Sequence, residues 1–173
     1  MLKNSKHQVY KADLKTITKK QAGGIYINFD KEEINKESAK ITWQWSISNL
    51  INVDFGLWDK TDSILEFYRF LDENVWFPIY ETECIKNDLN PAFSPFQITM
   101  ERLCGNNRFL PIKVHCRDVD NFGTGKFIGY FTFTMNNVLS GGIDTFELRN
   151  ELLEKKSGNN CLGTVKVSIK NKK

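Results

Sequence analysis

The sequence predicts an all-β protein, an antiparallel sandwich of eight strands with an extra N-terminal strand before it. Short segments in which apolar and polar residues alternate recur along the chain, and this period of two is typical of strands with one buried face. Turn-forming residues separate these segments about every 10 to 15 residues, and no long helical period is found. Many short strands without long helices indicate two packed sheets.

The composition supports one folded domain with a core. The chain has 173 residues, of which 40% are apolar and 13% are aromatic, so we expect folding rather than disorder. The net charge of +3 is too small to indicate a nucleic-acid partner. No apolar run approaches the roughly 18 residues of a membrane-spanning segment, and the N-terminus lacks the apolar centre of a signal peptide.

The cysteines do not form a recognisable binding or cross-linking pattern. The sequence has four cysteines at irregular spacings and only two histidines. Neither a zinc site nor a disulfide framework is therefore predicted. We expect four reduced thiols and a cytoplasmic protein.

The N-terminal part of the chain, residues 1–39, is expected to be a separate segment with one strand. Residues 1–22 are polar, rich in lysine and weakly patterned, and at least the part up to Tyr10 should be loosely held. Gly23–Asp30 has apolar residues at alternate positions and predicts a short strand. A charged connector follows, and residues 40–173 form the predicted domain.

The clearest strand of the domain is Lys40–Asn49, where Ile41, Trp43, Trp45 and Ile47 alternate with polar residues. Burying that face is worth several kcal/mol at roughly 25 cal/mol per Å².

Seven more strands follow. Pro78 lacks the backbone N–H of a central strand and predicts an edge or irregular strand. Glu101–Gly105 is expected to form one helical turn, and Glu154–Asn160 a basic loop. The seven strands are expected at Ser63–Phe70, Val75–Cys84, Phe93–Met100, Phe109–Arg117, Lys126–Thr134, Thr145–Leu148 and Leu162–Lys170.

The loop between the strands Phe109–Arg117 and Lys126–Thr134 carries the most informative residues. Asp118 and Asp120 lie one residue apart at the end of a strand, where two carboxylates can converge on a hard divalent cation. Phe122 would lie at the tip of this loop, and an apolar tip beside an acidic pocket suits a surface that touches lipid. Taken alone, the two aspartates are more often plain turn residues.

A calcium loop of the EF-hand type is excluded. Asp118, Asp120 and Gly123 fit the start of such a loop, but its twelfth position is Gly129 rather than glutamate.

Residues 40–170 resemble a C2 domain, most closely the second of the two tandem C2 domains of copines. The resemblance depends on several short motifs in a fixed order. Those motifs are Lys60-Thr61-Asp62, Thr82-Glu83, Ile85-Lys86-Asn87, Leu89-Asn90-Pro91, Pro95-Phe96, Leu103-Cys104, Asp118-x-Asp120 and Ile128-Gly129.

Residues 19–30 resemble the last strand of the preceding copine C2 domain. The resemblance therefore implies that this chain is a fragment or a shortened relative of a copine.

The resemblance also implies a sandwich whose loops at one end bind calcium and anionic phospholipid. Asp62, Asp118 and Asp120 match ligand positions of the family. The family's first aspartate would fall at Gly56, so Asp54 or Asp59 could supply it, and Asp54 is preferred because Asp54-Phe55-Gly56 is similar to the family's loop.

Two positions of the third loop depart from the family pattern. Lys126 stands where the last aspartate is expected, and Phe122 stands where copines have a further aspartate. Replacing a carboxylate by an ammonium changes the local charge by two units, and each unit opposes a divalent ion by a few kcal/mol at about 4–6 Å and an effective dielectric constant near 20. We therefore expect calcium binding to be weak or lost, with Lys126 as a tethered cation among Asp62, Asp118 and Asp120.

The apolar residues of the loops have two interpretations. Phe55, Trp58 and Phe122 suit insertion into a bilayer interface, but they would also suit a cap over the end of the core. Insertion is favoured for Phe122, and Trp58 is left open.

A basic stripe is predicted on one face of the strand Phe109–Arg117. Its members, Lys113, His115 and Arg117, could bind phosphoinositide headgroups, or they could form an ordinary solvated face near Glu81 and Glu83.

The function expected from these observations is binding to anionic phospholipid membranes by a peripheral cytoplasmic module, with calcium as an uncertain cofactor. The alternative is a calcium-independent protein-interaction domain that uses a strand edge. An enzyme is not expected, and no small-molecule substrate is predicted, because the sequence has no Gly-x-Ser-x-Gly, no His-Glu-x-x-His and no phosphate-binding glycine loop.

Overall fold

The computed structural model describes residues 7–15, 21–30, 40–54, 59–73, 75–119, 125–141 and 144–170. Its contacts divide the chain into two units, Met1–Glu37 and Ser38–Lys173. Each unit is described by itself.

The first unit contains an antiparallel pair of strands, β1 (His7–Lys15) and β2 (Gln21–Asp30). The predicted strand Gly23–Asp30 corresponds to β2, and β1 is a second strand that the sequence pattern did not predict. Backbone pairing from His7↔Asp30 to Asp13↔Gly24 defines the additional strand. The residues of β1 alternate only weakly in polarity, and a strand defined by its partner's hydrogen bonds has no clear sequence pattern of its own.

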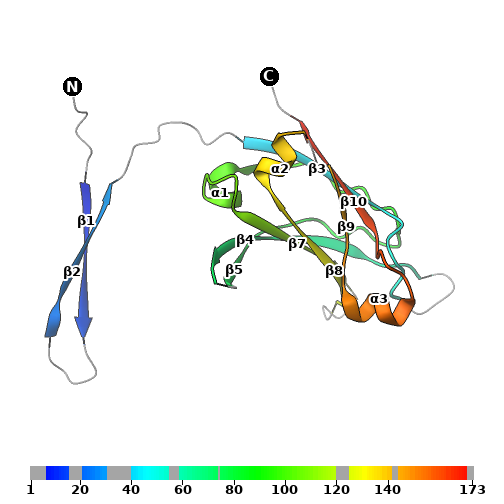
Figure 1. The fold of residues 1–173 in the computed structure, drawn as a ribbon, viewed down its shortest axis with the longest axis horizontal. Helices are drawn as coiled ribbons and strands as arrows, with labels where there is room; N and C mark the ends of the chain where they lie inside the picture. The colour runs from blue at the N-terminus through cyan, green and yellow to red at the C-terminus, as the bar shows by residue number, and fades with distance from the viewer. Residues whose placement is uncertain are drawn as a thin grey trace. The chain divides into compact units, whose positions relative to one another are not determined.

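The second unit is a sandwich of two four-stranded antiparallel sheets (Figure 1). One sheet has the order β6-β3-β10-β9 and the other has the order β5-β4-β7-β8. All eight predicted strands are confirmed, with small changes at their ends. The strands are β3 (Lys40–Ser48), β4 (Ser63–Asp72), β5 (Val75–Glu81), β6 (Phe96–Thr99), β7 (Pro111–Asp118), β8 (Phe127–Thr134), β9 (Thr145–Glu147) and β10 (Thr164–Lys170).

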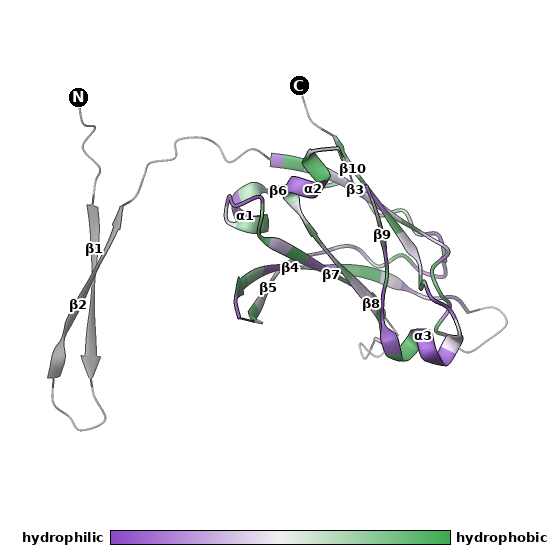
Figure 2. Cartoon of the chain, in the orientation of Figure 1, coloured by the Kyte–Doolittle hydropathy of each residue, from purple (hydrophilic) through white to green (hydrophobic). Residues whose placement is uncertain are grey.

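The core between the sheets is built around two stacked tryptophans. Trp43 and Trp45 on β3 are both 1% exposed, and their ring centroids lie 5.5 Å apart. Phe67 of the opposite sheet packs edge-on against Trp45 at 5.3 Å. Apolar residues therefore fill the space between the sheets. Hydrophobic and hydrophilic residues both occur along the strands (Figure 2). Cys84, Cys104, Cys116 and Cys161 are free thiols in this structure.

Three short helices connect the strands. The predicted turn near Glu101 is α1 (Met100–Cys104), which begins after the cap Thr99 and ends at Gly105 with a φ of 59°. The sequence pattern did not predict α2 (Met135–Leu139) or α3 (Glu151–Ser157). The predicted basic loop at Glu154–Asn160 is therefore wrong in its first half, because the capping residue Asn150 starts a helix too short to show a period.

Four connections meet at one end of the sandwich, which we call the loop end. They are residues 49–62, 82–95, 119–126 and 148–163. The antiparallel registers place their flanking residues together, with Ser48 opposite Thr164 in one sheet and Ser63 opposite Asp118 in the other. Hydrogen bonds join the connections, including Leu50 N to Leu89 O at 2.8 Å and Ile51 N to Leu162 O at 2.9 Å.

Candidate functional site

Two predicted site residues, Asp62 and Asp118, meet at the loop end. Asp118 is the last residue of β7, and its Oδ1 accepts a hydrogen bond from the backbone N of Asp62 at 2.9 Å. Asp62 in turn accepts one from the backbone N of Asn87 at 2.8 Å. These two carboxylates therefore join two of the connections, 49–62 and 82–95, to the end of β7.

The side chain of Lys126 lies beside the carboxylates of Asp54 and Asp118. Its Nζ donates to the backbone O of Val53 at 3.0 Å and to Oδ1 of Asp54 at 3.1 Å. The distance from this Nζ to Oδ2 of Asp118 is 3.9 Å. The backbone O of Lys126 also accepts from the N of Asp118 at 2.8 Å, so the chain holds the ammonium close to both acids.

Asp118 is the most deeply placed charge of this cluster, with a side chain only 1% exposed. Burial raises the pKa of its carboxyl, and the carboxylate of Asp54 raises it further. The hydrogen bond from Asp62 and the charge of Lys126 lower the pKa of Asp118. Oδ2 of Asp118 is buried and accepts no hydrogen bond, so the nearby ammonium compensates its charge through space.

The carboxylates that the structure describes here do not by themselves complete a calcium site. Ca²⁺ takes six to eight oxygen ligands, several of them charged. Within the described ranges, no group of three or more His, Cys, Asp or Glu side chains is arranged to hold a metal. Asp54, Asp62 and Asp118 each use one carboxylate oxygen to accept a hydrogen bond from the protein itself. The residues seen here suit a lysine ammonium better than a divalent metal.

The remaining predicted loop residues lie outside the part that the structure describes. They are the expected ligand Asp120 and the expected membrane contacts Phe55, Trp58 and Phe122. Between the two candidates for the first acidic position, the structure brings Asp54 to Lys126. The backbone O of Asp59 accepts a hydrogen bond from the Asn52 side chain at 2.9 Å.

Two asparagines shape the site in a way that the sequence did not predict, although Asn87 belongs to one of the C2-like motifs. Asn52 Oδ1 accepts hydrogen bonds from the backbone N of Thr61 and of Asp54. Asn87, with a φ of 54°, accepts from the backbone N of Lys60 at 2.9 Å. Asparagine tolerates this left-handed conformation and caps turns with its side chain, so their position in turn clusters was the available signal.

The basic stripe lies on the outer face of β7, as predicted, but its members are engaged by different groups. Arg117 donates to Oε1 of Glu66 at 3.1 Å and to the backbone O of Gly125 at 3.1 Å. Lys113 Nζ lies 3.9 Å from the ring centroid of Trp76. Glu66, on β4, is therefore the acidic partner of the stripe.

His115 lies in the middle of this stripe, 4.0 Å from Oε2 of Glu66. Burial lowers the pKa of His115, the charge of Glu66 raises it, and Lys113 and Arg117 lower it. Its ring packs between Tyr68 at 4.8 Å and Phe127 at 5.0 Å. The imidazole is therefore part of an aromatic face.

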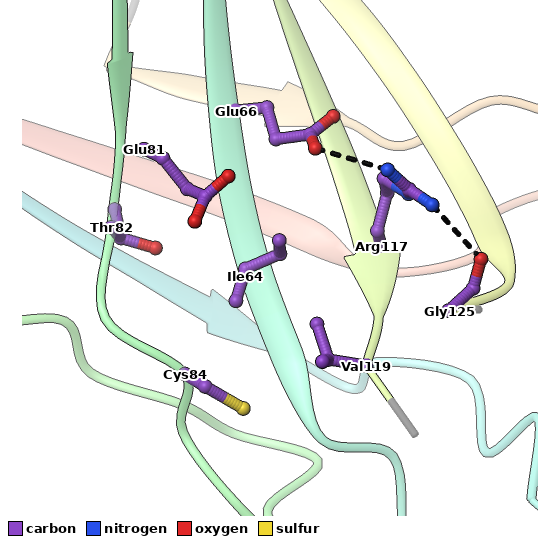
Figure 3. A pocket seen from close by; sticks show the side chains of 8 residues that line it. All are labelled: Ile64, Glu66, Glu81, Thr82, Cys84, Arg117, Val119 and Gly125. Atoms are coloured by element: carbon purple, nitrogen blue, oxygen red, sulfur yellow. Dashed lines mark hydrogen bonds and ion pairs between the residues drawn. The ribbon is translucent and has the colours of Figure 1, made fainter. Parts of the chain in front are cut away.

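A shallow cavity of about 270 Å³ lies between the end of β5 and the end of β7, next to the loop end (Figure 3). Glu66 and Glu81 occupy directly opposite positions on β4 and β5, and Arg117 lines the same cavity. Like charges at paired positions repel one another, and the contact of Arg117 with Glu66 offsets this repulsion.

Within the described part of the chain, no helix has the length and apolar character that crossing a bilayer requires.

Comparison with known proteins identifies the class of domain. Residues 42–149 match the family model of the C2 domain. The structure is similar to BON1-C2B, with a TM-score of 0.57 and 20% identity over 78% of this chain and 94% of that one. It is also similar to C2 domain A of plant Extended Synaptotagmin 1, with a TM-score of 0.52 and 14% identity over 79% of this chain and 97% of that one.

A further neighbour is the calcium-bound pair of C2 domains, A and B, of Extended Synaptotagmin 2. Its TM-score is 0.52, with 14% identity over 77% of this chain and 45% of that one. At these identities the structural similarities establish the fold, and the family match covers more than half of the chain.

Proposed function

The chain belongs to the C2 domain family, and on that premise we propose that it is a non-catalytic module that binds anionic phospholipid membranes through its loop end, with little contribution from calcium. We also propose that it is copine-like and acts in the cytoplasm as a peripheral membrane protein. The motifs Thr82-Glu83, Leu89-Asn90-Pro91 and Ile128-Gly129 support the copine-like assignment.

The observation that carries the proposal is the position of Lys126. Its ammonium lies 3.1 Å from a carboxylate oxygen of Asp54 and 3.9 Å from one of Asp118. In a calcium-binding loop end, a divalent cation holds acidic side chains from separate connections together and leaves the surface positive enough for anionic lipid. Here Lys126 would hold the acids together, and it would also repel an incoming calcium ion.

The predicted membrane contacts extend this proposal. Phe55, Trp58 and Phe122 belong to the connections of the loop end and would enter the bilayer interface. Lys113 and Arg117 would attract headgroups, each charge contributing about 1 kcal/mol near an anionic surface. Arg117 is shared with Glu66, so we expect Lys113 to contribute more of this attraction.

Co-sedimentation with vesicles tests the proposal. The full chain is mixed with vesicles of phosphatidylcholine, or of phosphatidylcholine with phosphatidylserine, in a calcium chelator or in calcium. We expect sedimentation with the anionic vesicles in both buffers, reduced by high salt because the attraction is electrostatic. Absence of binding to the anionic vesicles in both buffers would contradict the proposal.

That negative result would favour the alternative function, a calcium-independent protein-interaction domain. One observation supports this alternative. Three large apolar side chains of the hairpin formed by β4 and β5 are exposed, Leu71 at 47%, Val75 at 54% and Phe77 at 51%. β5 is an edge strand of its sheet, and edge strands can pair with a partner's strand.

A further inference from the structure

The helix α3 carries the most exposed large apolar side chain that the structure describes. Leu152 is 81% exposed. An isolated exposed leucine needs no explanation by itself. Leu152, however, belongs to the connection 148–163, which is one of the four that form the loop end. Its charged neighbours on the same helix face are both positive.

The local structure fixes α3 in its orientation. Asn150 caps the helix by accepting hydrogen bonds from the backbone N of Leu152 and Leu153. The Asn150 side chain also donates to the backbone O of Ile128 at 3.0 Å, at the start of β8. Leu153 is partly buried and packs against the core. The helix is therefore anchored on the side of Leu153, and the adjacent Leu152 faces away from the core.

The exposed face of α3 combines this leucine with two cations. Lys155 and Lys156 follow Leu152 by three and four residues, so all three share one helix face, and both lysines are exposed. Figure 2 shows hydrophobic and hydrophilic residues mixed along α3. A short helix with an apolar residue and lysines on its outer face is suited to the interface of an anionic bilayer.

The acidic residues of α3 do not cancel these cations. Glu154 accepts hydrogen bonds from Nε of Arg149 at 2.8 Å and from the backbone N of Asn150 at 2.9 Å. These hydrogen bonds and the charge of Arg149 lower the pKa of the Glu154 carboxyl, and Glu154 is directed toward its own cap. Glu151 is then the one acidic side chain of α3 that offsets the charges of Lys155 and Lys156, so the net charge of the exposed face is positive.

We propose that α3 is an additional membrane-contact element, in which Leu152 enters the interface of an anionic bilayer and Lys155 and Lys156 contact the headgroups. This inference rests on the proposed membrane function and adds a third connection to the two that carry Phe55, Trp58 and Phe122. Leu152 is held on a capped helix, so less conformational freedom is lost on insertion than for a residue in an unstructured loop.

Leu139 provides a matched control. It is the last residue of α2, it is 49% exposed, and α2 follows the end of β8 that is opposite to the loop end (Figure 1). Both Leu→Ser substitutions remove an exposed leucine from a short helix, and only the substitution in α3 should affect membrane binding.

The experiment measures binding of the full chain to vesicles of phosphatidylserine and phosphatidylcholine in a calcium chelator. We expect Leu152→Ser to weaken binding about tenfold and Leu139→Ser to leave it unchanged. Replacing Lys155 and Lys156 together by Gln should weaken binding several-fold, and less so at high salt. A Leu152→Trp variant should show a blue shift of its fluorescence on adding vesicles beyond that of the wild type.

The outcomes separate the two proposals. Should the wild-type chain not bind these vesicles at all, the proposed function fails and the role of α3 falls with it. Should the wild type bind while Leu152→Ser binds equally well, or while both leucine variants weaken binding equally, only the role of α3 is overturned. Thermal unfolding of each variant confirms that the fold is intact.

Discussion

Lys126 and Asp118 are neighbours because β7 and β8 are joined by a short connection and paired in register. The backbone N of Asp118 donates to the backbone O of Lys126 at 2.8 Å, and this pairing brings the Lys126 side chain to the loop end. The resemblance to the C2 family, in which Lys126 stands at the position of a ligand aspartate, predicts an ammonium among Asp62, Asp118 and Asp120. The structure brings Lys126 to Asp54 and Asp118, and Asp120 lies outside the described residues. The preference for Asp54 over Asp59 depends on the similarity of Asp54-Phe55-Gly56 to the family's loop, because periodicity does not show how the connection 49–62 folds around Asn52.

The charges around His115 and Asp118 give opposite dependences of stability on pH. Burial lowers the pKa of His115 below its usual value of 6.5, so the unfolded chain binds more protons there. The stability that His115 contributes is present above about pH 6.5 and is lost as pH falls through the lower pKa of the folded state. Burial raises the pKa of Asp118 above 3.8, so its contribution is present below that pH and is lost as pH rises through the raised pKa.

Replacing His115 by Gln should therefore flatten the pH dependence of stability below about pH 6.5. The free energy of unfolding of the wild type should fall more steeply than that of His115→Gln as the solution is acidified, because the buried imidazole must gain a charge near Lys113 and Arg117. Urea denaturation at a series of pH values measures this difference. Comparison of the two proteins at each pH cancels the opposing effect of Asp118. Parallel curves for the wild type and His115→Gln across the whole acidic range would contradict the assignment.

At the scale of the elements, the connection between β7 and β8 has one position where only glycine fits. A Cβ at Gly125 would overlap the backbone O of Asp118. The backbone O of Gly125 also accepts a hydrogen bond from Arg117 at 3.1 Å. The close approach of the two backbones therefore holds the end of this connection against the stripe on β7.

Gly125→Ala should lower the free energy of unfolding by roughly 1–3 kcal/mol, because the added methyl group forces the two backbone segments apart. Guanidinium denaturation measures the change. Gly141→Ala serves as the matched control: a Cβ at Gly141 meets no atom within 4 Å, and its φ of 74° costs about 1 kcal/mol in alanine. A loss at Gly125 no larger than that at Gly141 would show that the connection can widen without strain.

The strands of the sandwich could be predicted from sequence because the alternation of apolar and polar residues that identifies a strand also decides which of its side chains are buried. In β3, burial alternates along the strand in the same way as apolar and polar residues alternate in the sequence. The helices α2 and α3 could not be predicted in this way, because they are only five and seven residues long. Their caps, Thr134 and Asn150, decide where they begin, and such residues are equally common in turns.

At the scale of the whole molecule, the loop end is a consequence of antiparallel order. Every second connection of an antiparallel chain returns to the same end, so the prediction of strands was sufficient to bring Asp62 and Asp118 together. The sequence did not predict that the connection 148–163 forms a helix at this end. It also did not predict the pairing of β1 with β2, because backbone hydrogen bonds define β1 more clearly than its side-chain pattern does.

We propose that the charge balance of the loop end makes the molecule a C2 module that carries its own cation. An ammonium that is covalently attached needs no calcium signal, so membrane binding would respond to lipid charge and salt alone. A carboxylate in place of Lys126 would remove two units of positive charge from the cluster and should restore attraction for a divalent ion.

Calorimetric titration of calcium into the wild type and into Lys126→Asp tests this claim most directly, with Lys126→Gln as the control that removes the ammonium without adding a carboxylate. We predict no binding of calcium to the wild type in the low micromolar range, a gain of at least about tenfold in affinity for Lys126→Asp, and a smaller gain for Lys126→Gln. A wild-type dissociation constant in the low micromolar range would contradict the claim that Lys126 takes the place of the metal.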